Sequence, residues 1–199
     1  MTISYTNRKG RTYYLCQGTT KTGKPRYYFS REPEGTPVKE MPAGYTIRES
    51  VNAIVSLVKA RPALLREEEI AVVQAALRKH PQAKLYRVDA QARRITIYEH
   101  VGPDMRDLVK SLATELGMSG LRDKDMAQRA EAEEKIYGQF TPVMRFDLAD
   151  SQRRYFKAQR MCYRGSIDDW IDIEFDKSIK ELARRLIPTL GTDEFFELF

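Results

Sequence analysis

The chain has 199 residues, of which 42% are hydrophobic and 31% are charged, the composition of an ordinary soluble protein that can bury its own core. Its 34 Lys and Arg outnumber its 28 Asp and Glu, which gives a net charge of +6. No apolar run approaches the roughly 20 residues that span a bilayer, and the polar, basic N-terminus lacks the apolar stretch of a signal peptide. We therefore expect a cytoplasmic protein that does not bind a membrane.

The two cysteines and two histidines do not have the spacing of a metal site. Cys16 and Cys162 lie in distant parts of the chain, each among alternating apolar residues, where cysteine behaves as a small hydrophobic residue. Buried free thiols are expected in preference to a disulfide or a reactive cysteine. No Ser or Cys lies near a histidine in the sequence, so no nucleophilic triad is indicated. The sequence predicts no catalytic residue, no cofactor and no metal ion.

The positive charge is concentrated in the first third of the chain. Residues 1–60 contain ten Lys and Arg against four Glu, a net charge of +6, so residues 61–199 are neutral overall. The first 31 residues contain seven basic side chains, no acidic side chain and six interleaved aromatic residues. Because such cations repel one another, the cluster is most easily explained by an anionic partner, typically a nucleic-acid backbone.

Residues 1–61 predict a small, basic module of antiparallel β-strands. Strands are expected over residues 12–17, 26–30, 45–49 and 51–59. The first two form a predicted hairpin, because the residues that connect them include glycines and other turn-forming residues. This loop also approaches a nucleotide-binding P-loop, but Pro25 stands where a magnesium-binding Ser or Thr is required. The range 51–59 fits a helical stripe as well, and its β-branched residues favour a strand.

Residues 62–199 predict a larger α+β domain in which antiparallel hairpins pack against helices. Its boundary is expected at Arg61 and Pro62, since proline restricts the residue before it and breaks regular structure. Helices are expected over residues 66–79, 104–116, 123–137 and 178–187. Strands are expected over residues 84–89, 94–99, 141–148, 154–163 and 169–175. This mixture of hairpins and helices argues against a doubly wound parallel sheet.

The principal functional hypothesis is non-enzymatic binding of DNA or RNA by the basic, aromatic hairpin. Its cations can neutralise phosphates, its exposed tyrosines can stack on unpaired bases for about 1–3 kcal/mol each, and a two-stranded ribbon fits a DNA major groove. The residues assigned to this interface are Arg8, Lys9, Arg11, Tyr13, Tyr14, Lys21, Lys24, Arg26, Tyr27, Tyr28 and Arg31. Because side chains alternate along a strand, about half of the tyrosines are expected in the core. Protection of a sheet edge and contact with an acidic protein are the alternative roles of these cations.

A metal-dependent nuclease is the second hypothesis. Four carboxylates of the predicted C-terminal hairpin are candidate oxygen ligands for Mg²⁺: Asp168, Asp169, Asp172 and Glu174. Asp172 and Glu174 are expected on one strand face together with Trp170, which suits two ligands of one ion. The acids do not follow a nuclease spacing.

The predicted strand at residues 154–163 carries a row of arginines. Period-two alternation places Arg154, Arg160 and Arg164 on one face, together with apolar residues. We expect these arginines to pair with the acids of the following strand in preference to forming a separate anion site.

A protein-interaction module is the third hypothesis. Residues 123–137 predict a helix with a largely polar surface, as expected for a solvated face or a partner contact. The aromatic tail at residues 195–199, which includes Phe195 and Phe199, cannot direct all of its apolar side chains to one side of a helical turn. Docking of this tail on its own chain is favoured over a homodimer contact.

Overall fold

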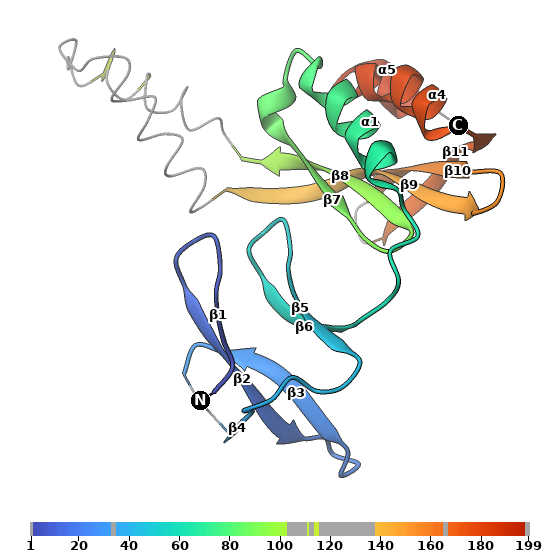
Figure 1. Ribbon diagram of the computed structural model, residues 1–199. Coiled ribbons are helices and arrows are strands. Elements are labelled where there is room, and N and C mark those ends of the chain that lie inside the picture. Colours follow the sequence, from blue (N-terminus) through green and yellow to red (C-terminus); the bar gives the residue numbers. More distant parts are fainter. Residues whose placement is uncertain are drawn as a thin grey trace. The chain divides into compact units, whose positions relative to one another are not determined.

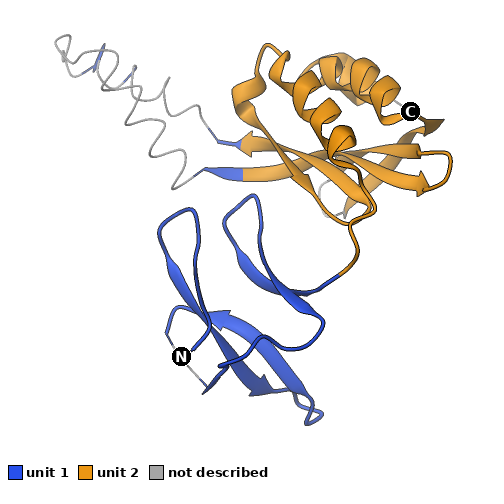
Figure 2. Cartoon of the chain, in the orientation of Figure 1, with its two compact units in different colours: residues 1–60, 101–139 blue, residues 61–100, 140–199 orange. Residues whose placement is uncertain are grey.

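The computed structural model describes residues 2–32, 35–102, 138–164 and 167–197, together with Ser111, Thr114 and Glu115 (Figure 1). The chain divides into two compact units: unit 1 comprises residues 1–60 and 101–139, and unit 2 comprises residues 61–100 and 140–199 (Figure 2). Antiparallel strands and short helices make up the described elements, which confirms the α+β class. The helices predicted over residues 104–116 and 123–137 lie outside the described residues, apart from the three residues named above.

The regular elements of unit 1 within residues 1–60 are β-strands. The strands are β1 (Ser4–Thr6), β2 (Thr12–Thr19), β3 (Pro25–Ser30), β4 (Thr36–Pro37), β5 (Tyr45–Glu49) and β6 (Val55–Lys59). β2 lies between β1 and β3 and also pairs with β4, while β5 and β6 form a separate antiparallel hairpin. The predicted β2–β3 hairpin is confirmed, with Cys16 opposite Tyr28 and Gln17 opposite Tyr27.

The centre of β2 lies in the core of unit 1. Leu15 and Cys16 are both fully buried although their side chains leave opposite faces of the strand, so both faces of β2 are covered there. Cys16 is a free, buried thiol, as predicted. The prediction of one strand over residues 51–59 is wrong in its first half, because residues 50–54 form a turn and β6 begins at Val55.

A five-stranded sheet forms the centre of unit 2. Its strands are β7 (Tyr86–Ala90), β8 (Arg94–Val101), β9 (Gln139–Asp150), β10 (Tyr155–Arg164) and β11 (Ile167–Lys177). They lie in the order β11-β10-β9-β8-β7, and the pairs β7–β8, β9–β10 and β10–β11 are antiparallel. Each strand predicted in this region occurs, although β7 begins later than expected because residues 83–85 form a 3-10 turn. Cys162 in β10 is a free thiol, as predicted, but it is half-buried where a buried position was expected.

Helices cover one face of this sheet (Figure 1). The described ones are α1 (Glu67–Arg78), α4 (Ile179–Leu186) and α5 (Asp193–Glu197). α1 and α4 confirm the helices predicted over residues 66–79 and 178–187. α4 begins with a capping box, in which Ser178 Oγ accepts a hydrogen bond from Glu181 N and the Glu181 carboxylate accepts one from Ser178 N. A 3-10 helix at Ile187–Thr189, which contains Pro188, follows α4 directly.

The core of unit 2 lies between these helices and the sheet. Its buried side chains include Val73, Leu77, Ile95, Ile97, Phe146, Phe156, Leu182 and Leu186. Along β8, along β10 and along β9 from Met144 to Leu148, the apolar core residues occupy alternate positions, so the residues between them point to the other face of the sheet. That second face carries charged side chains from each of the three strands, such as Arg94, Arg145 and Lys157.

Candidate nucleic-acid interface

The turn between β1 and β2, at residues 7–11, is organised by the side chain of Asn7. This residue is only 4% exposed. Its Oδ1 accepts hydrogen bonds from Lys9 N at 3.1 Å and from Arg11 N at 2.9 Å. Its Nδ2 donates to Ala53 O at 2.8 Å, in the turn between β5 and β6. One buried amide therefore shapes the β1–β2 turn and joins it to the turn at residues 50–54, and we call these two segments the paired turns.

Glu49, at the end of β5, gives the paired turns a second connection. Its carboxylate accepts hydrogen bonds from Arg8 N at 3.2 Å and from Tyr5 OH at 3.0 Å, and it lies 3.7 Å from Arg8 Nε. The hydrogen bond to this carboxylate, followed by burial and by its negative charge, raises the pKa of Tyr5. Glu49 thus offsets one of the three cations that the β1–β2 turn carries.

The β1–β2 turn brings Arg8, Lys9 and Arg11 close together. Burial, followed by the charges of Arg8 and Arg11, lowers the pKa of Lys9 below its ordinary value. A neighbouring anion would relieve this repulsion, since an opposite charge favours the ionised form of lysine. The electrostatic environment of the paired turns therefore suits a negatively charged ligand.

The tip of the β2–β3 hairpin carries the second group of cations. Thr20 N donates to Lys24 O at 2.8 Å and Gly23 N donates to Thr20 O at 2.9 Å, with Gly23 at a left-handed φ of 78°. Lys21, Lys24 and Arg26 are exposed on this tip, and they form no ion pair with any residue that the structure describes. These three side chains are free to contact an external anion.

The predicted interface residues form two groups and not one patch. β2 has eight residues and separates the groups by about 25 Å, because a strand rises about 3.4 Å per residue. The β2–β3 tip holds one group. The other lies at the opposite end of β2 and includes Arg31, which directly follows β3 at the end where Ser30 pairs with Tyr14. The sequence places all these cations in one segment, but the hairpin sends them to both ends.

The tyrosines assigned to the interface are all half-buried, so the expected division into core and surface tyrosines is wrong. The residues concerned are Tyr13, Tyr14, Tyr27 and Tyr28. Tyr27 packs against Tyr45, with 6.2 Å between the ring centroids. Tyr28 covers two glycines: a Cβ on Gly18 would lie 3.3 Å from its ring, and one on Gly35 would lie 2.9 Å from its hydroxyl. Because both faces of this small sheet are partly covered, no tyrosine is wholly core or wholly surface.

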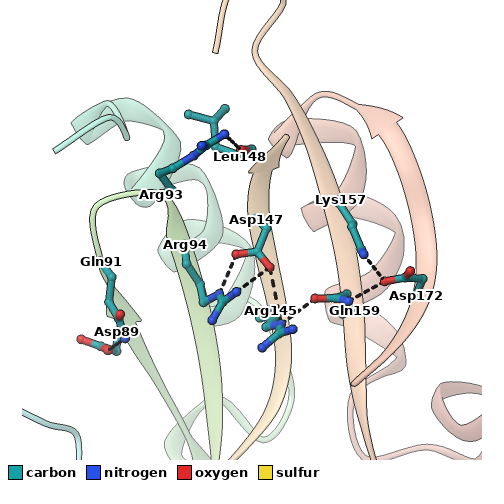
Figure 3. Close-up of polar contacts among 10 residues, drawn as sticks. All are labelled: Asp89, Gln91, Arg93, Arg94, Arg145, Asp147, Leu148, Lys157, Gln159 and Asp172. Carbon is teal, nitrogen blue, oxygen red and sulfur yellow. Dashed lines mark hydrogen bonds and ion pairs between the residues drawn. The ribbon is translucent and has the colours of Figure 1, made fainter. Parts of the chain in front are cut away.

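The charged face of the unit 2 sheet carries a row of hydrogen bonds and ion pairs (Figure 3). Its members are Arg94, Asp147, Arg145, Gln159, Asp172 and Lys157. Arg94 binds Asp147 through two contacts, Nε–Oδ1 at 2.5 Å and Nη2–Oδ2 at 3.0 Å. Arg145 Nε lies 3.5 Å from Asp147 Oδ2, and its guanidinium lies 4.1 Å from the centroid of the Trp170 ring. The two arginines therefore share one carboxylate.

The same row continues to the edge strand β11. Arg145 Nε donates to Gln159 Oε1 at 2.6 Å, and Gln159 Nε2 donates to Asp172 Oδ1 at 2.5 Å. Lys157 Nζ lies 2.6 Å from the same Asp172 oxygen. The hydrogen bond from Lys157 lowers the pKa of Asp172, with a further contribution from Gln159. Positive and negative groups alternate along this row, in contrast to the cations of unit 1.

The expectation that Asp172 and Glu174 share a strand face is wrong. Asp172 lies opposite Gln159, whereas Glu174 lies opposite Ala158, so the register shifts by one residue between the two acids. Adjacent residues of β10 point to opposite faces, and Ala158 belongs to the core. Glu174 accordingly pairs with Arg185 on α4, on the helix side of the sheet. The bulge separates the two carboxylates that were the strongest metal-ligand pair.

The other acids proposed as ligands of a nuclease metal do not form a metal site either. Asp168 and Asp169 are exposed at the beginning of β11, and Asp169 Oδ1 accepts a hydrogen bond from Trp170 N at 2.7 Å. No group of three His, Cys, Asp or Glu side chains within the described ranges is arranged to hold a metal ion. The carboxylates of this hairpin are partners of cations or are spread along its surface.

The arginine row of β10 has other partners than the expected acids of β11. Arg154 pairs with Glu69 at the beginning of α1 and donates to Leu64 O at 3.1 Å. Arg160 Nη2 donates to Phe196 O, in helix α5, at 3.0 Å. The side chain of Arg164 lies outside the described residues. The expected pairing within the hairpin is wrong for Arg154, because this residue lies in the turn before β10 and reaches α1. Arg160 lies on the face of the sheet that the helices cover, where it reaches α5.

The aromatic tail is divided between core and surface. Phe195 is 4% exposed and belongs to the core of unit 2, whereas Phe196 is 62% exposed. Their rings meet edge to face at 5.5 Å. Phe199 and the residue before it lie outside the described residues. Docking on the same chain is thus observed for Phe195.

The sequence predictions give no functional role to three residues in or next to the paired turns: Asn7, Glu49 and Ile54. The run Asn-Arg-Lys-Gly at residues 7–10 contains the turn residues Asn and Gly and is the signal that identifies the first turn. Ile54 lies in the apolar range 51–59, for which a strand is predicted, and its exposure follows from the turn that this prediction misses.

Comparison of the chain with protein-family models, with curated proteins and with solved structures gives no match. In the described part of the chain, no helix combines the length and the apolar character that crossing a bilayer requires.

Proposed function

We propose that this protein binds DNA or RNA without cleaving it, through the cations of a basic β-module at residues 1–61 that precedes the α+β domain at residues 62–199. One observation carries the proposal: exposed cations of unit 1 form no ion pair with any described residue. Five of them belong to the predicted interface: Arg11, Lys21, Lys24, Arg26 and Arg31. Uncompensated cations at both ends of one hairpin suit a long polyanion better than a small anion.

The contrast between the two units supports the same proposal. Cations on the charged face of unit 2 are paired with carboxylates on neighbouring strands, as Arg94 is with Asp147. Unit 1 offsets Arg8 with Glu49 and leaves Lys9 next to two further positive charges, and burial together with these charges lowers the pKa of Lys9. Neutralisation of phosphates by such cations releases counterions and makes binding weaker at high salt.

Fluorescence anisotropy with labelled single-stranded and double-stranded DNA and RNA, measured over a salt series, tests the proposal. If five phosphates are neutralised, the logarithm of the binding constant should fall with the logarithm of the salt concentration with a slope of roughly −4. The triple variant Lys21→Ala, Lys24→Ala, Arg26→Ala should reduce that slope by about 3. A control variant with the same change of charge in unit 2, Lys79→Ala, Lys180→Ala, Arg184→Ala, should keep the full slope.

Two results would reject this function. Absence of binding at low salt, or a full slope in the triple variant of the hairpin tip, would show that these cations are not a nucleic-acid interface. Probes should remain intact after incubation with Mg²⁺ or Mn²⁺. Cleavage that disappears with Asp172→Ala would replace simple binding by the nuclease hypothesis.

A further inference from the structure

Ile54 is an apolar side chain in an unusual position. It lies in the β5–β6 turn of unit 1 and is 61% exposed, while its neighbours Ala53 and Val55 are buried. A single exposed apolar residue is ordinary on a protein surface. This one follows Ala53, whose carbonyl is hydrogen-bonded to Asn7 of the cationic β1–β2 turn.

The turn holds Ile54 in a defined position. Ser50 N donates to Ile54 O at 2.9 Å, and Ile54 N donates to Ser50 Oγ at 3.1 Å. Ala53 has a left-handed φ of 61°, and its carbonyl accepts the hydrogen bond of the buried Asn7 amide. The exposed isoleucine is therefore built on a hydrogen-bonded turn and is not carried by a loose loop.

The same network of hydrogen bonds joins the turn of Ile54 to the cationic β1–β2 turn. Asn7 connects Ala53 to the backbone of Lys9 and Arg11, and Glu49 connects the end of β5 to Arg8. The paired turns thus carry one exposed apolar side chain and three cations, of which Arg8 is paired with Glu49. Both turns point the same way out of unit 1 (Figure 1).

We propose that Ile54 is a wedge that enters a base step of duplex DNA or RNA from the minor groove while Arg8, Lys9 and Arg11 hold the adjoining phosphates. Isoleucine is among the side chains that proteins insert between base pairs, and such insertion partly unstacks the step and kinks the duplex. Pyrimidine–purine steps such as TA deform most easily, so the wedge should prefer them. This inference rests on the proposed nucleic-acid binding and adds bending of the duplex to it.

An anionic membrane is the other partner that combines apolar and cationic groups. Stable membrane attachment takes a larger apolar surface or a second anchor in addition to a basic patch. The paired turns offer one isoleucine, and unstacking a single base step requires no more than one wedge. The geometry therefore favours a duplex.

The test uses a short duplex with one central TA step, labelled at its ends for energy transfer, and the full chain. Wild type should bring the duplex ends closer together. Ile54→Ala should abolish most of this change, weaken binding by about tenfold and leave the salt slope unaltered, because it removes apolar contact and no charge. Met41→Ala, a truncation of another exposed apolar residue of unit 1, should leave bending and affinity at the wild-type level.

Each outcome that differs from these expectations has one interpretation. If wild type binds the duplex without bending it, or if Ile54→Ala bends it as wild type does, the wedge is wrong and nucleic-acid binding stands. If wild type binds no nucleic acid, the proposed function itself fails. If wild type instead binds mixed phosphatidylcholine–phosphatidylserine vesicles and Ile54→Ala does not, the partner is a membrane and the wedge is rejected. Because Ile54 is exposed, its truncation should not prevent folding, and circular dichroism checks this.

Discussion

The substitution Asn7→Ala removes the side-chain amide that joins the paired turns of unit 1. In wild type this amide makes three described hydrogen bonds, one donated to Ala53 O and two accepted from Lys9 N and Arg11 N. Alanine can replace none of them. The backbone groups of Lys9 and Arg11 can turn to water, whereas Ala53 is 3% exposed and its carbonyl loses a donor in a buried place.

The structure sets the size of the expected effect. A hydrogen bond contributes about 1 kcal/mol net, and a buried group left without its partner costs about 1–3 kcal/mol. For this set of contacts we expect a loss of about 3 kcal/mol in the stability of the paired turns. A module of some 60 residues has a free energy of unfolding of roughly 3–9 kcal/mol, so the loss is a large fraction of the total.

Amide hydrogen exchange followed by mass spectrometry measures this loss in unit 1. Peptides from β2 and β6 should exchange about a hundredfold faster in Asn7→Ala than in wild type, since 1.4 kcal/mol corresponds to a factor of ten. Trp170, the single tryptophan of the chain, belongs to unit 2 and reports separately on that unit by fluorescence. Ser56→Ala, which truncates an exposed polar residue of β6, is the control and should leave the exchange rates near wild type.

Acceleration below about fivefold in Asn7→Ala would refute the reasoning, because it would mean that water or a shifted backbone replaces all three hydrogen bonds. Equal acceleration in the Ser56→Ala control would refute it as well. In that case the exchange would reflect a general weakness of β6 and not the connection between the turns.

Two further predictions concern unit 2, and both use the urea midpoint of Trp170 fluorescence. Arg154→Ala leaves Glu69, whose side chain is 8% exposed, without its cation, and should lower the free energy of unfolding by about 3 kcal/mol. Burial opposes ionisation of Glu69, but Arg154 and the Arg66 backbone N–H hold its pKa below the usual 4.5. This stabilisation is therefore complete above that pH and is lost as pH falls through the folded pKa. Arg154→Ala removes the contribution of Arg154 and should weaken this pH dependence. Arg145→Lys keeps the charge but removes the guanidinium plane over Trp170, and should cost about 1 kcal/mol and shift the emission maximum. An unchanged midpoint in either variant would contradict the corresponding contact.

Local patterns are sufficient for much of this fold. The acidic first turn of α1, the capping residues Ser178 and Glu181 of α4 and the alternation in the hairpin strands depend on residues a few positions apart. The concentration of cations in residues 1–31 is likewise a property of composition. These features place the β-module, the α+β region and the basic segment without knowledge of any long-range contact.

The partners of individual side chains depend on tertiary packing. Asn7 and Ala53 are 46 positions apart, and Arg154 and Glu69 are 85 positions apart, so no local pattern connects either pair. A one-residue register shift in β11 separates Asp172 from Glu174, and strand alternation alone cannot foresee it. Because β2 is eight residues long, the cations of one basic segment lie at the two opposite ends of a hairpin. The sequence therefore specifies which charges unit 1 carries, and the folded chain specifies where they meet, because register and packing are set by contacts between distant residues.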